Sequence, residues 1–595
     1  MGTTSFSIPT WRRRDTSTAR TRSPFSPSSG TNRPSEPRSS FSVKKGSPAG
    51  LPFSFCPGNV IVSSMEGSSS RKVDTIISAR RIYSVDGQFS TAESMALRDG
   101  RIVALGGRED IEAAFHAARR IDLGESFVYP GFMDPHCHFL SYGYLLQRAW
   151  LFGTKSWEET VARLVAHHAE QPGAWVQGRG WDQNKWSPAQ FPTNELLDRA
   201  FPREAVLAIR VDGHAAIANS AALAAAGIDA STTIEGGTVA ISGGKPSGLL
   251  LDNAVDRVRD AIPPPGEATM RKALLAAQRN CFAAGLTSVS NAGTEMHEAL
   301  LFGKMGGEAA LSIRIYAMLA PTKENIEFFA SRGPLAGDRL TIRSFKMFAD
   351  GALGSRGARL LEPYADDPEN LGLFTLDPAE LDRVCRVARA CGFQMNVHAI
   401  GDAAARLVLD AYERHLEPGN DLRWRIEHAQ LVHDDDLPRF GRLGVIPSIQ
   451  TTHATSDMAW IEFRLGASRM GRAHRYRDLL TQNGWIANGS DFPIEMIEPL
   501  RGFRSAVFRK DDEGLPAGGF QPLQALSRVE ALRAMTIWAA RANFEEENRG
   551  SLEPGKWADF TVLDTDIIEG DEDSIYKAQI HSVAVAGEFT FETPI

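Results

Sequence analysis

The stretch PGFMDPHCHF, residues 130–139, decides the expected fold. It closes an apolar run that begins at Phe127, and a short apolar run bounded by Gly or Pro is typical of a buried strand. Side chains alternate along a strand, so His136 and His138 point the same way and Cys137 points away from them. Two imidazoles on one face suit a single metal ion, because zinc and related ions prefer imidazole nitrogens. Two hydrogen-bonded core histidines are the alternative that this stretch alone leaves open.

Apolar segments of strand length recur down the chain, separated by stretches with helical periodicity such as PAELDRVCRVARACG. Strands that alternate with amphipathic helices predict an α/β fold, and eight of them predict a (β/α)8 barrel. The eight expected strands are 127–134, 286–291, 311–319, 343–350, 394–400, 423–430, 445–451 and 485–493.

The segments outside this repeat predict smaller attached parts. Short alternating strands fill residues 73–128, and similar strands return in residues 545–595, so we expect both chain ends to pair into one small β-sandwich around a barrel at 129–544. The gap between the first and second barrel strands is far longer than an ordinary loop. We therefore expect an insertion at residues 150–266 over the barrel mouth.

Residues 1–72 are rich in Ser, Pro and Arg and poor in acids, which predicts a disordered leader. This composition is typical of an organellar transit peptide, and a non-functional extension or a misassigned start with Met65 as the true one are the alternatives. The chain is expected in the cytoplasm, or in an organelle if the leader is a transit peptide.

Composition narrows the class of partner. The formal net charge of −8 and the absence of a long apolar run exclude nucleic acid and membrane as main partners, so we expect a small-molecule substrate. Five irregularly spaced cysteines predict neither a disulfide framework nor a CxxC metal site. Symmetric oligomers are common among soluble proteins, and a homodimer is the assembly we consider.

Residues of ligand type stand near the carboxyl ends of four later strands: Lys346, His398, His428 and Asp491. In a barrel these ends converge on one face, where such enzymes place their active sites. Together with His136 and His138 they predict a metal centre.

These motifs resemble the amidohydrolase superfamily and, within it, the YtcJ-like (amidohydrolase 3) branch related to N-substituted formamide deformylases. The resemblance is carried by PGFMDPHCHF, VDGHAAIANSAAL, FKMFADGALGSRGA, NVHAIGDAA, RIEHAQ, NGSDFPIE and LEPGKWADF. It implies a first divalent metal, zinc by preference, on His136, His138 and Asp491. It also implies a second metal on His398 and His428, with Lys346 bridging the two metals as an N-carboxylated lysine.

The implied activity is hydrolysis of a non-peptide carbon–nitrogen bond of the amide or formamide type. A metal-activated hydroxide attacks the carbonyl, and Asp491 acts as general acid and base. A buried lysine readily loses its proton and can then capture carbon dioxide, although an ammonium that binds a substrate carboxylate is the alternative for Lys346. A mononuclear deaminase or heterocycle hydrolase, and a catalytically silent scaffold, are the competing functions.

Four further residues are candidate substrate contacts. Trp181, Asp212 and His214 lie in the insertion, in segments that resemble the substrate cover of the family, and Arg356 follows the fourth strand. A local polar pair is the alternative for Asp212 and His214. We expect structural or surface roles for His433, His453 and His474, which lack placement at a strand end.

Overall fold

The computed structural model describes residues 61–62 and 71–593. The predicted leader, residues 1–72, falls almost entirely outside the described residues; its described positions are β1 (Ile61–Val62) and the first two residues of β2 (Arg71–Tyr83). Among the described helices, none is both long and apolar enough to cross a membrane.

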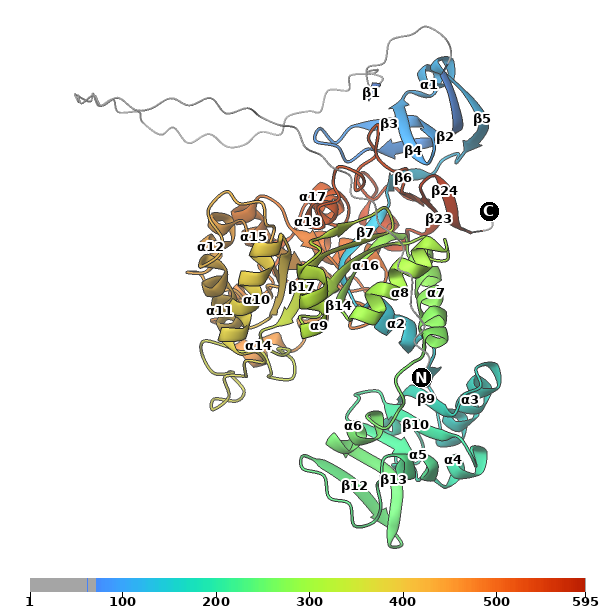
Figure 1. The fold of residues 1–595 in the computed structure, drawn as a ribbon, viewed down its shortest axis with the longest axis vertical. Helices are drawn as coiled ribbons and strands as arrows, with labels where there is room; N and C mark the ends of the chain where they lie inside the picture. Colours follow the sequence, from blue (N-terminus) through green and yellow to red (C-terminus); the bar gives the residue numbers. More distant parts are fainter. Residues whose placement is uncertain (1–60, 63–70, 594–595) are drawn as a thin grey trace, which may run out of the picture. The chain divides into compact units, whose positions relative to one another are not determined.

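Eight parallel strands form the central sheet, in the order β21-β20-β19-β18-β17-β15-β14-β7, and the short β16 (Leu335–Ala336) pairs antiparallel with β17. Figure 1 labels β7, β14 and β17 of this sheet. Beyond β21 the chain returns to β7, where the Asp491 amide donates to the His136 carbonyl and the His138 amide donates to the Phe492 carbonyl, each at 2.8 Å. These two bonds join the last part of the barrel to the first, so the barrel is nearly closed. The predicted eight-stranded parallel barrel is confirmed. The strands are β7 (Phe132–Cys137), β14 (Leu286–Thr294), β15 (Arg314–Leu319), β17 (Leu340–Phe348), β18 (Gln394–Ala399), β19 (Arg425–His428), β20 (Ile446–Ile449) and β21 (Ala487–Asn488).

The first barrel strand differs from the prediction. The expected strand at 127–134 is two strands, β6 (Phe127–Pro130) in a different sheet and β7 in the barrel, with Gly131 between them. A Cβ at Gly131 would lie 2.3 Å from Thr287 Oγ1, so only glycine allows the backbone to pass this close to β14. The apolar run continues through the break and hides it in the sequence.

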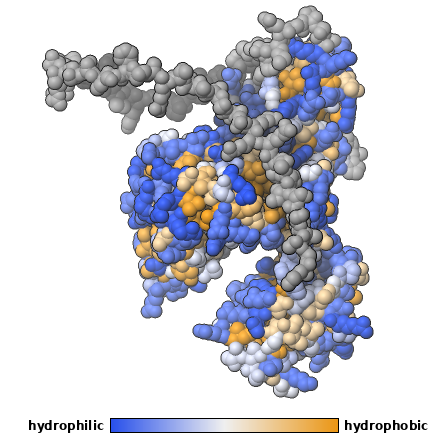
Figure 2. Space-filling model, in the orientation of Figure 1, coloured by the Kyte–Doolittle hydropathy of each residue, from blue (hydrophilic) through white to orange (hydrophobic). Residues whose placement is uncertain are grey.

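Amphipathic helices pack on the outside of the barrel strands. In α10 (Pro378–Cys391) the Asp377 carboxylate accepts from the Ala379 amide, proline occupies the first turn, and Gly392 ends the helix in the left-handed conformation at φ 77°. Its buried residues recur at helical spacing and face the barrel. Figure 2 shows mainly hydrophilic residues over the outer helices of this part. Other helices that follow barrel strands are α2 (Phe139–Leu145), α8 (Met296–Gly307), α9 (Lys323–Ala330), α11 (Asp402–Glu413), α12 (Leu437–Leu443), α13 (Thr451–Asp457) and α16 (Pro499–Phe508).

A second sheet contains both ends of the described chain. Its order is β1-β4-β3-β2-β6-β22-β23-β24, with β5 paired to β2. The antiparallel pairing of β6 with β22, in register from Phe127 with Leu563 to Pro130 with Phe560, joins the two ends. The remaining bounds are β3 (Thr91–Arg98), β4 (Arg101–Gly106), β5 (Phe115–Asp122), β22 (Phe560–Leu563), β23 (Ile580–Val585) and β24 (Glu588–Glu592).

The insertion between β7 and β14 has a sheet and hydrophobic cores of its own. The sheet order is β12-β13-β11-β10-β9-β8. That the insertion covers the barrel mouth stays a prediction. Its strands are β8 (Ala149–Trp150), β9 (Trp175–Trp181), β10 (Ala205–Arg210), β11 (Ala215–Ala218), β12 (Gly237–Ser242) and β13 (Lys245–Asp252).

A buried ion pair connects the barrel to the sheet of the chain ends. Arg314 on β15 donates from Nη2 to Asp559 Oδ1 at 2.7 Å, and the two side chains are 1% and 3% exposed. The Ala586 amide also donates to this carboxylate, at 2.8 Å. The pair therefore replaces the hydration that both charges lose on burial.

Candidate metal centre

The predicted ligands lie at the carboxyl ends of the barrel strands. His136 is on β7, Lys346 on β17, His398 on β18 and His428 at the end of β19, while Asp491 follows β21. Parallel pairing sets His398 beside Phe348 and His428 beside Ala399. The barrel topology thus brings residues from distant parts of the sequence to one face.

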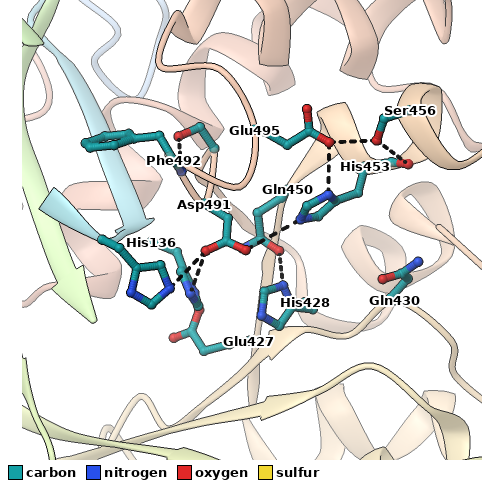
Figure 3. A network of polar contacts seen from close by, with 12 residues as sticks. His136, Glu427, His428, Gln430, Gln450, His453, Ser456, Asp491, Phe492 and Glu495 are labelled. Atoms are coloured by element: carbon teal, nitrogen blue, oxygen red, sulfur yellow. Dashed lines mark hydrogen bonds and ion pairs between the residues drawn. The ribbon is translucent and has the colours of Figure 1, made fainter. Parts of the chain in front are cut away.

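A first group of three ligand-type residues is complete. Asp491 Oδ1 lies 3.5 Å from His136 Nε2 and 3.3 Å from His138 Nε2. Within the described part of the chain, these three residues can offer ligand atoms that all lie within 4.8 Å of one another. Figure 3 shows the Asp491 carboxylate between the neighbouring imidazoles.

Partners behind two of the imidazoles fix their orientation. His136 Nδ1 is 2.6 Å from Glu427 Oε2, and His428 Nδ1 is 2.7 Å from Gln450 Oε1 (Figure 3). Both oxygens are acceptors, so each Nδ1 carries the proton and each Nε2 is left as a lone-pair donor. A carboxylate or carbonyl behind a histidine is the usual support of a metal ligand.

His398 and Lys346 complete the cluster. The rings of His398 and His428 have centroids 4.5 Å apart, and those of His136 and His428 are 4.9 Å apart. Lys346 is 1% exposed, and its Nζ lies 4.1 Å from the centroid of the Phe348 ring. Among the described residues, Lys346 Nζ has no hydrogen-bond partner.

Burial favours the neutral forms of these bases. It lowers the pKa of His136, it lowers that of His398 to about 3, and it holds that of His428 well below its usual range. Burial also lowers the pKa of Lys346, although Glu427 and Asp491 oppose that shift. Neutral imidazole is the form that binds a metal, and a neutral amine is the form that captures carbon dioxide.

Asp491 keeps its negative charge. Burial alone would raise its pKa, but the close imidazoles of His138 and His453, together with those of His136 and His428, outweigh this effect and leave the pKa well below its usual range. The backbone of Asp491 is in the left-handed region at φ 63°, as is that of His428 at φ 73°. Such strain in non-glycine residues is typical of functional sites.

His453, for which the sequence analysis expected a structural or surface role, lies beside the predicted ligands instead. Within the described residues it forms a second potential cation-binding group with His428 and Asp491. Burial would lower its pKa, but Asp491 and Glu495 outweigh this and raise it to about 10. A signal was available, because His453 stands four residues beyond β20, the seventh barrel strand.

The four predicted substrate residues lie outside this cluster. Trp181 is fully buried in the core of the insertion, where its Nε1 donates to the Ala208 carbonyl at 2.9 Å, so its contacts are those of a packing residue. His214 pairs with Asp252 at 3.1 Å and is 76% exposed. Asp212 accepts from Arg210, and Arg356 pairs with Asp366 at 2.9 Å.

The residues present fit a divalent cation. Four atoms that are buried and lack a hydrogen-bond partner in the described structure belong to the predicted ligands: His136 Nε2, Lys346 Nζ, His398 Nε2 and Asp491 Oδ1. Buried polar atoms normally have partners, so their lack of one indicates a missing ligand. Nitrogen and carboxylate donors are those that zinc and related metals prefer.

A parallel barrel with this donor set at its carboxyl face defines the class of metal-dependent barrel hydrolases. The model of the amidohydrolase family matches residues 119–591, most of the chain. The chain belongs to the amidohydrolase family and is a hydrolase that acts on carbon–nitrogen bonds.

Known relatives extend over nearly the whole fold. The chain is 32% identical to YtcJ of Bacillus subtilis (strain 168) over 521 residues, which cover 86% of this chain and 98% of the relative. It is 31% identical to Protein LONG AFTER FAR-RED 3 of Arabidopsis thaliana, with coverage of 83% and 87%. It is 27% identical to the N-substituted formamide deformylase of Arthrobacter pascens, with coverage of 87% and 98%.

A solved structure shares the architecture. An uncharacterized metal-dependent hydrolase from Pyrococcus furiosus superposes with a TM-score of 0.72 at 28% sequence identity, covering 83% of this chain and all of that one. The family, this neighbour and the donor set together support a divalent metal as cofactor.

Proposed function

We propose that the protein hydrolyses a non-peptide amide, with an N-substituted formamide as the first candidate. The observation that carries the proposal is the convergence of four imidazoles, a buried lysine and the Asp491 carboxylate at the carboxyl face of the barrel. The N-substituted formamide deformylase among the relatives supports the choice of substrate.

Two divalent metals, zinc by preference, are proposed for this site. His136, His138 and Asp491 would hold the first, and His398 and His428 the second. Lys346 would bridge them as a carbamate, since its amine is buried, its pKa is lowered and its Nζ has no hydrogen-bond partner among the described residues. A carbamate supplies two oxygens, as a carboxylate does.

The residues of the site would then have separate roles in hydrolysis. When bound, a divalent metal lowers the pKa of water and polarises the carbonyl of a substrate. Asp491 accepts the proton of the attacking water and returns it to the departing amine. Glu427 and Gln450 keep the His136 and His428 rings in place, so no reorganisation is needed during the reaction.

The position of Phe348 favours a substrate that carries an apolar group next to the scissile bond. It lies two residues beyond Lys346 on β17, hence on the same face of the strand, and its ring centroid is 5.5 Å from that of His398. Yet Phe348 is 44% exposed. An aromatic side chain that adjoins the metal ligands and is open to solvent is suited to contact with a substrate.

A one-metal enzyme is the second candidate. His136, His138 and Asp491 form a complete set of three ligands without Lys346, as in catalytic zinc sites that keep a fourth position for water. Deamination or heterocycle hydrolysis would then be the reaction. In this case the uncarboxylated Lys346 would face the substrate.

Elemental analysis and amine release test the proposal together. We expect two metal equivalents per chain, amine release from a panel of N-substituted formamides and acetamides, and at least a 1,000-fold lower kcat in Asp491→Asn, in which the general base is lost. Thermal unfolding serves as the control for folding of this variant. One metal equivalent would favour the second candidate, and near-normal turnover in Asp491→Asn would refute the role of Asp491.

A further inference from the structure

His453 connects the metal centre to Glu495, a carboxylate outside the proposed ligand set. It lies in α13, beyond β20, and its ring stands between two carboxylates (Figure 3). His453 Nε2 lies 3.7 Å from Asp491 Oδ2, an ion-pair distance, and its Nδ1 lies 3.2 Å from Glu495 Oε1. The side chain of His453 is 15% exposed, so little solvent competes for these contacts.

The two oxygens of Asp491 therefore face different partners. Oδ1 faces His136 and His138, at 3.5 Å and 3.3 Å, and Oδ2 faces His453. A carboxylate turns readily about its last torsion, so contacts on both oxygens are needed to hold one orientation. The left-handed backbone of Asp491 at φ 63° adds to this need, because neighbouring contacts must maintain it.

Glu495 is held in turn by the same helix that carries His453. The Ser456 hydroxyl donates to Glu495 Oε1 at 2.6 Å, and His453 Nδ1 donates to the same oxygen (Figure 3). Glu495 follows Asp491 by four residues in the loop after β21. His453 and Ser456 thus fasten both ends of this short loop segment to α13.

We propose that His453, held by Glu495, is a positioning residue for Asp491. It fixes Oδ2 and thereby turns Oδ1 toward the site that His136 and His138 share. This inference rests on the proposed role of Asp491 as ligand and general base. The competing role for His453 is that of a metal ligand, because His428, His453 and Asp491 could also hold a cation.

The test compares His453→Gln, Glu495→Gln and the control His433→Gln, each loaded with Co²⁺. His433 stands five residues beyond β19, much as His453 follows β20, but it pairs with Asp435, an exposed residue. The measurements are cobalt per chain, the visible absorption of the bound Co²⁺, and kcat and KM on the best substrate of the formamide panel.

In His453→Gln we expect the wild-type ratio of cobalt to chain, an altered Co²⁺ absorption, a kcat about 100-fold lower and a KM changed less than about threefold, because small misplacements of a catalytic group cost this much. Glu495→Gln should show the same changes to a smaller degree, and His433→Gln none. Since Glu495 contacts His453 and is not one of the proposed ligands, this variant tests the idea even if His453→Gln misfolds.

Two results would overturn the inference. Loss of a cobalt equivalent in His453→Gln would make the residue a ligand, and unchanged absorption and kcat in both variants would leave His453 without a role at Asp491. Failure of the proposed function gives a different pattern, in which the wild type binds Co²⁺ but releases no amine. The absorption spectra of the variants still decide the position of Asp491 in that case.

Discussion

Lys346 combines three properties at the scale of the single residue: it is 1% exposed, its pKa is lowered, and no described residue donates to or accepts from its Nζ. If it bridges two metals as a carbamate, Lys346→Ala should lose at least one metal equivalent and nearly all activity. A short carboxylic acid such as propionate should then restore part of both, because it can occupy the place of the carbamate.

The measurement is metal per chain and amine release with and without propionate. Lys304→Ala is the control, since Lys304 is exposed and pairs with Glu267 at 2.7 Å. Full metal content in Lys346→Ala, with activity lost, would instead indicate a cationic lysine that binds substrate.

The positions of site residues near strand ends could be predicted from the sequence, whereas those of site residues in the following helices could not. Strand alternation and barrel topology predict where the proposed ligands lie, and the structure brings these residues together. They are His136, His138, Lys346, His398, His428 and Asp491. His453 was missed because it lies in the helix after its strand, where only the path of the chain decides its direction. Trp181 shows the converse, since a motif does not reveal that its ring is buried among Trp157 and Trp186.

At the scale of the element, α17 (Arg528–Ala534) depends on a capping box. Ser527 and Glu530 exchange hydrogen bonds at its N-terminus, and Arg477 forms a double ion pair with Glu530 at 2.6 and 2.7 Å. Burial would raise the pKa of Glu530, but Arg477 and Ser527 outweigh it and lower the pKa from 4.5 to about 2.

Because the folded-state pKa of Glu530 is lowered, its ionised form stabilises the protein above pH 4.5, and this contribution is lost as the pH falls toward 2. Glu530→Ala should reduce the free energy of unfolding by about 1–2 kcal/mol at pH 7. Glu530→Gln should lose less, since glutamine can still bond to the Ser527 amide. Urea unfolding at several pH values measures this; a difference from wild type that persists at pH 2 would contradict it.

Element boundaries were less predictable than element types. Every expected barrel strand has a counterpart, yet the first one breaks at Gly131, and the last one is only the two residues of β21. The apolar pattern is the same for a residue buried in the barrel and one buried in the adjoining sheet. Which sheet a residue joins depends on partners far away in the sequence, such as β22 for β6.

At the scale of the whole molecule, the Arg314 and Asp559 pair joins the barrel to the sheet of the chain ends. Asp559→Asn should destabilise the protein by about 3–5 kcal/mol, because it leaves the buried Arg314 without a counter-charge. Urea unfolding measures the loss. The control is Glu380→Gln, which breaks the exposed pair with Arg383, in which the side chains are 43% and 47% exposed, and should change stability by less than about 1 kcal/mol. An equal loss of unfolding free energy in the two variants would contradict the idea that burial makes the Arg314 and Asp559 pair important.

The pairing of β6 with β22 also means that β6 is synthesised long before its partner strand. Just beyond β6, the Phe132 amide donates to the Thr561 hydroxyl of β22, although the two residues lie 429 positions apart in the chain. A ribosome that adds roughly 5–20 residues per second needs about 20–90 s to make the chain between them. During that interval β6 has one edge without its final strand, so nascent chains should depend on chaperones that cover exposed strand edges until translation ends.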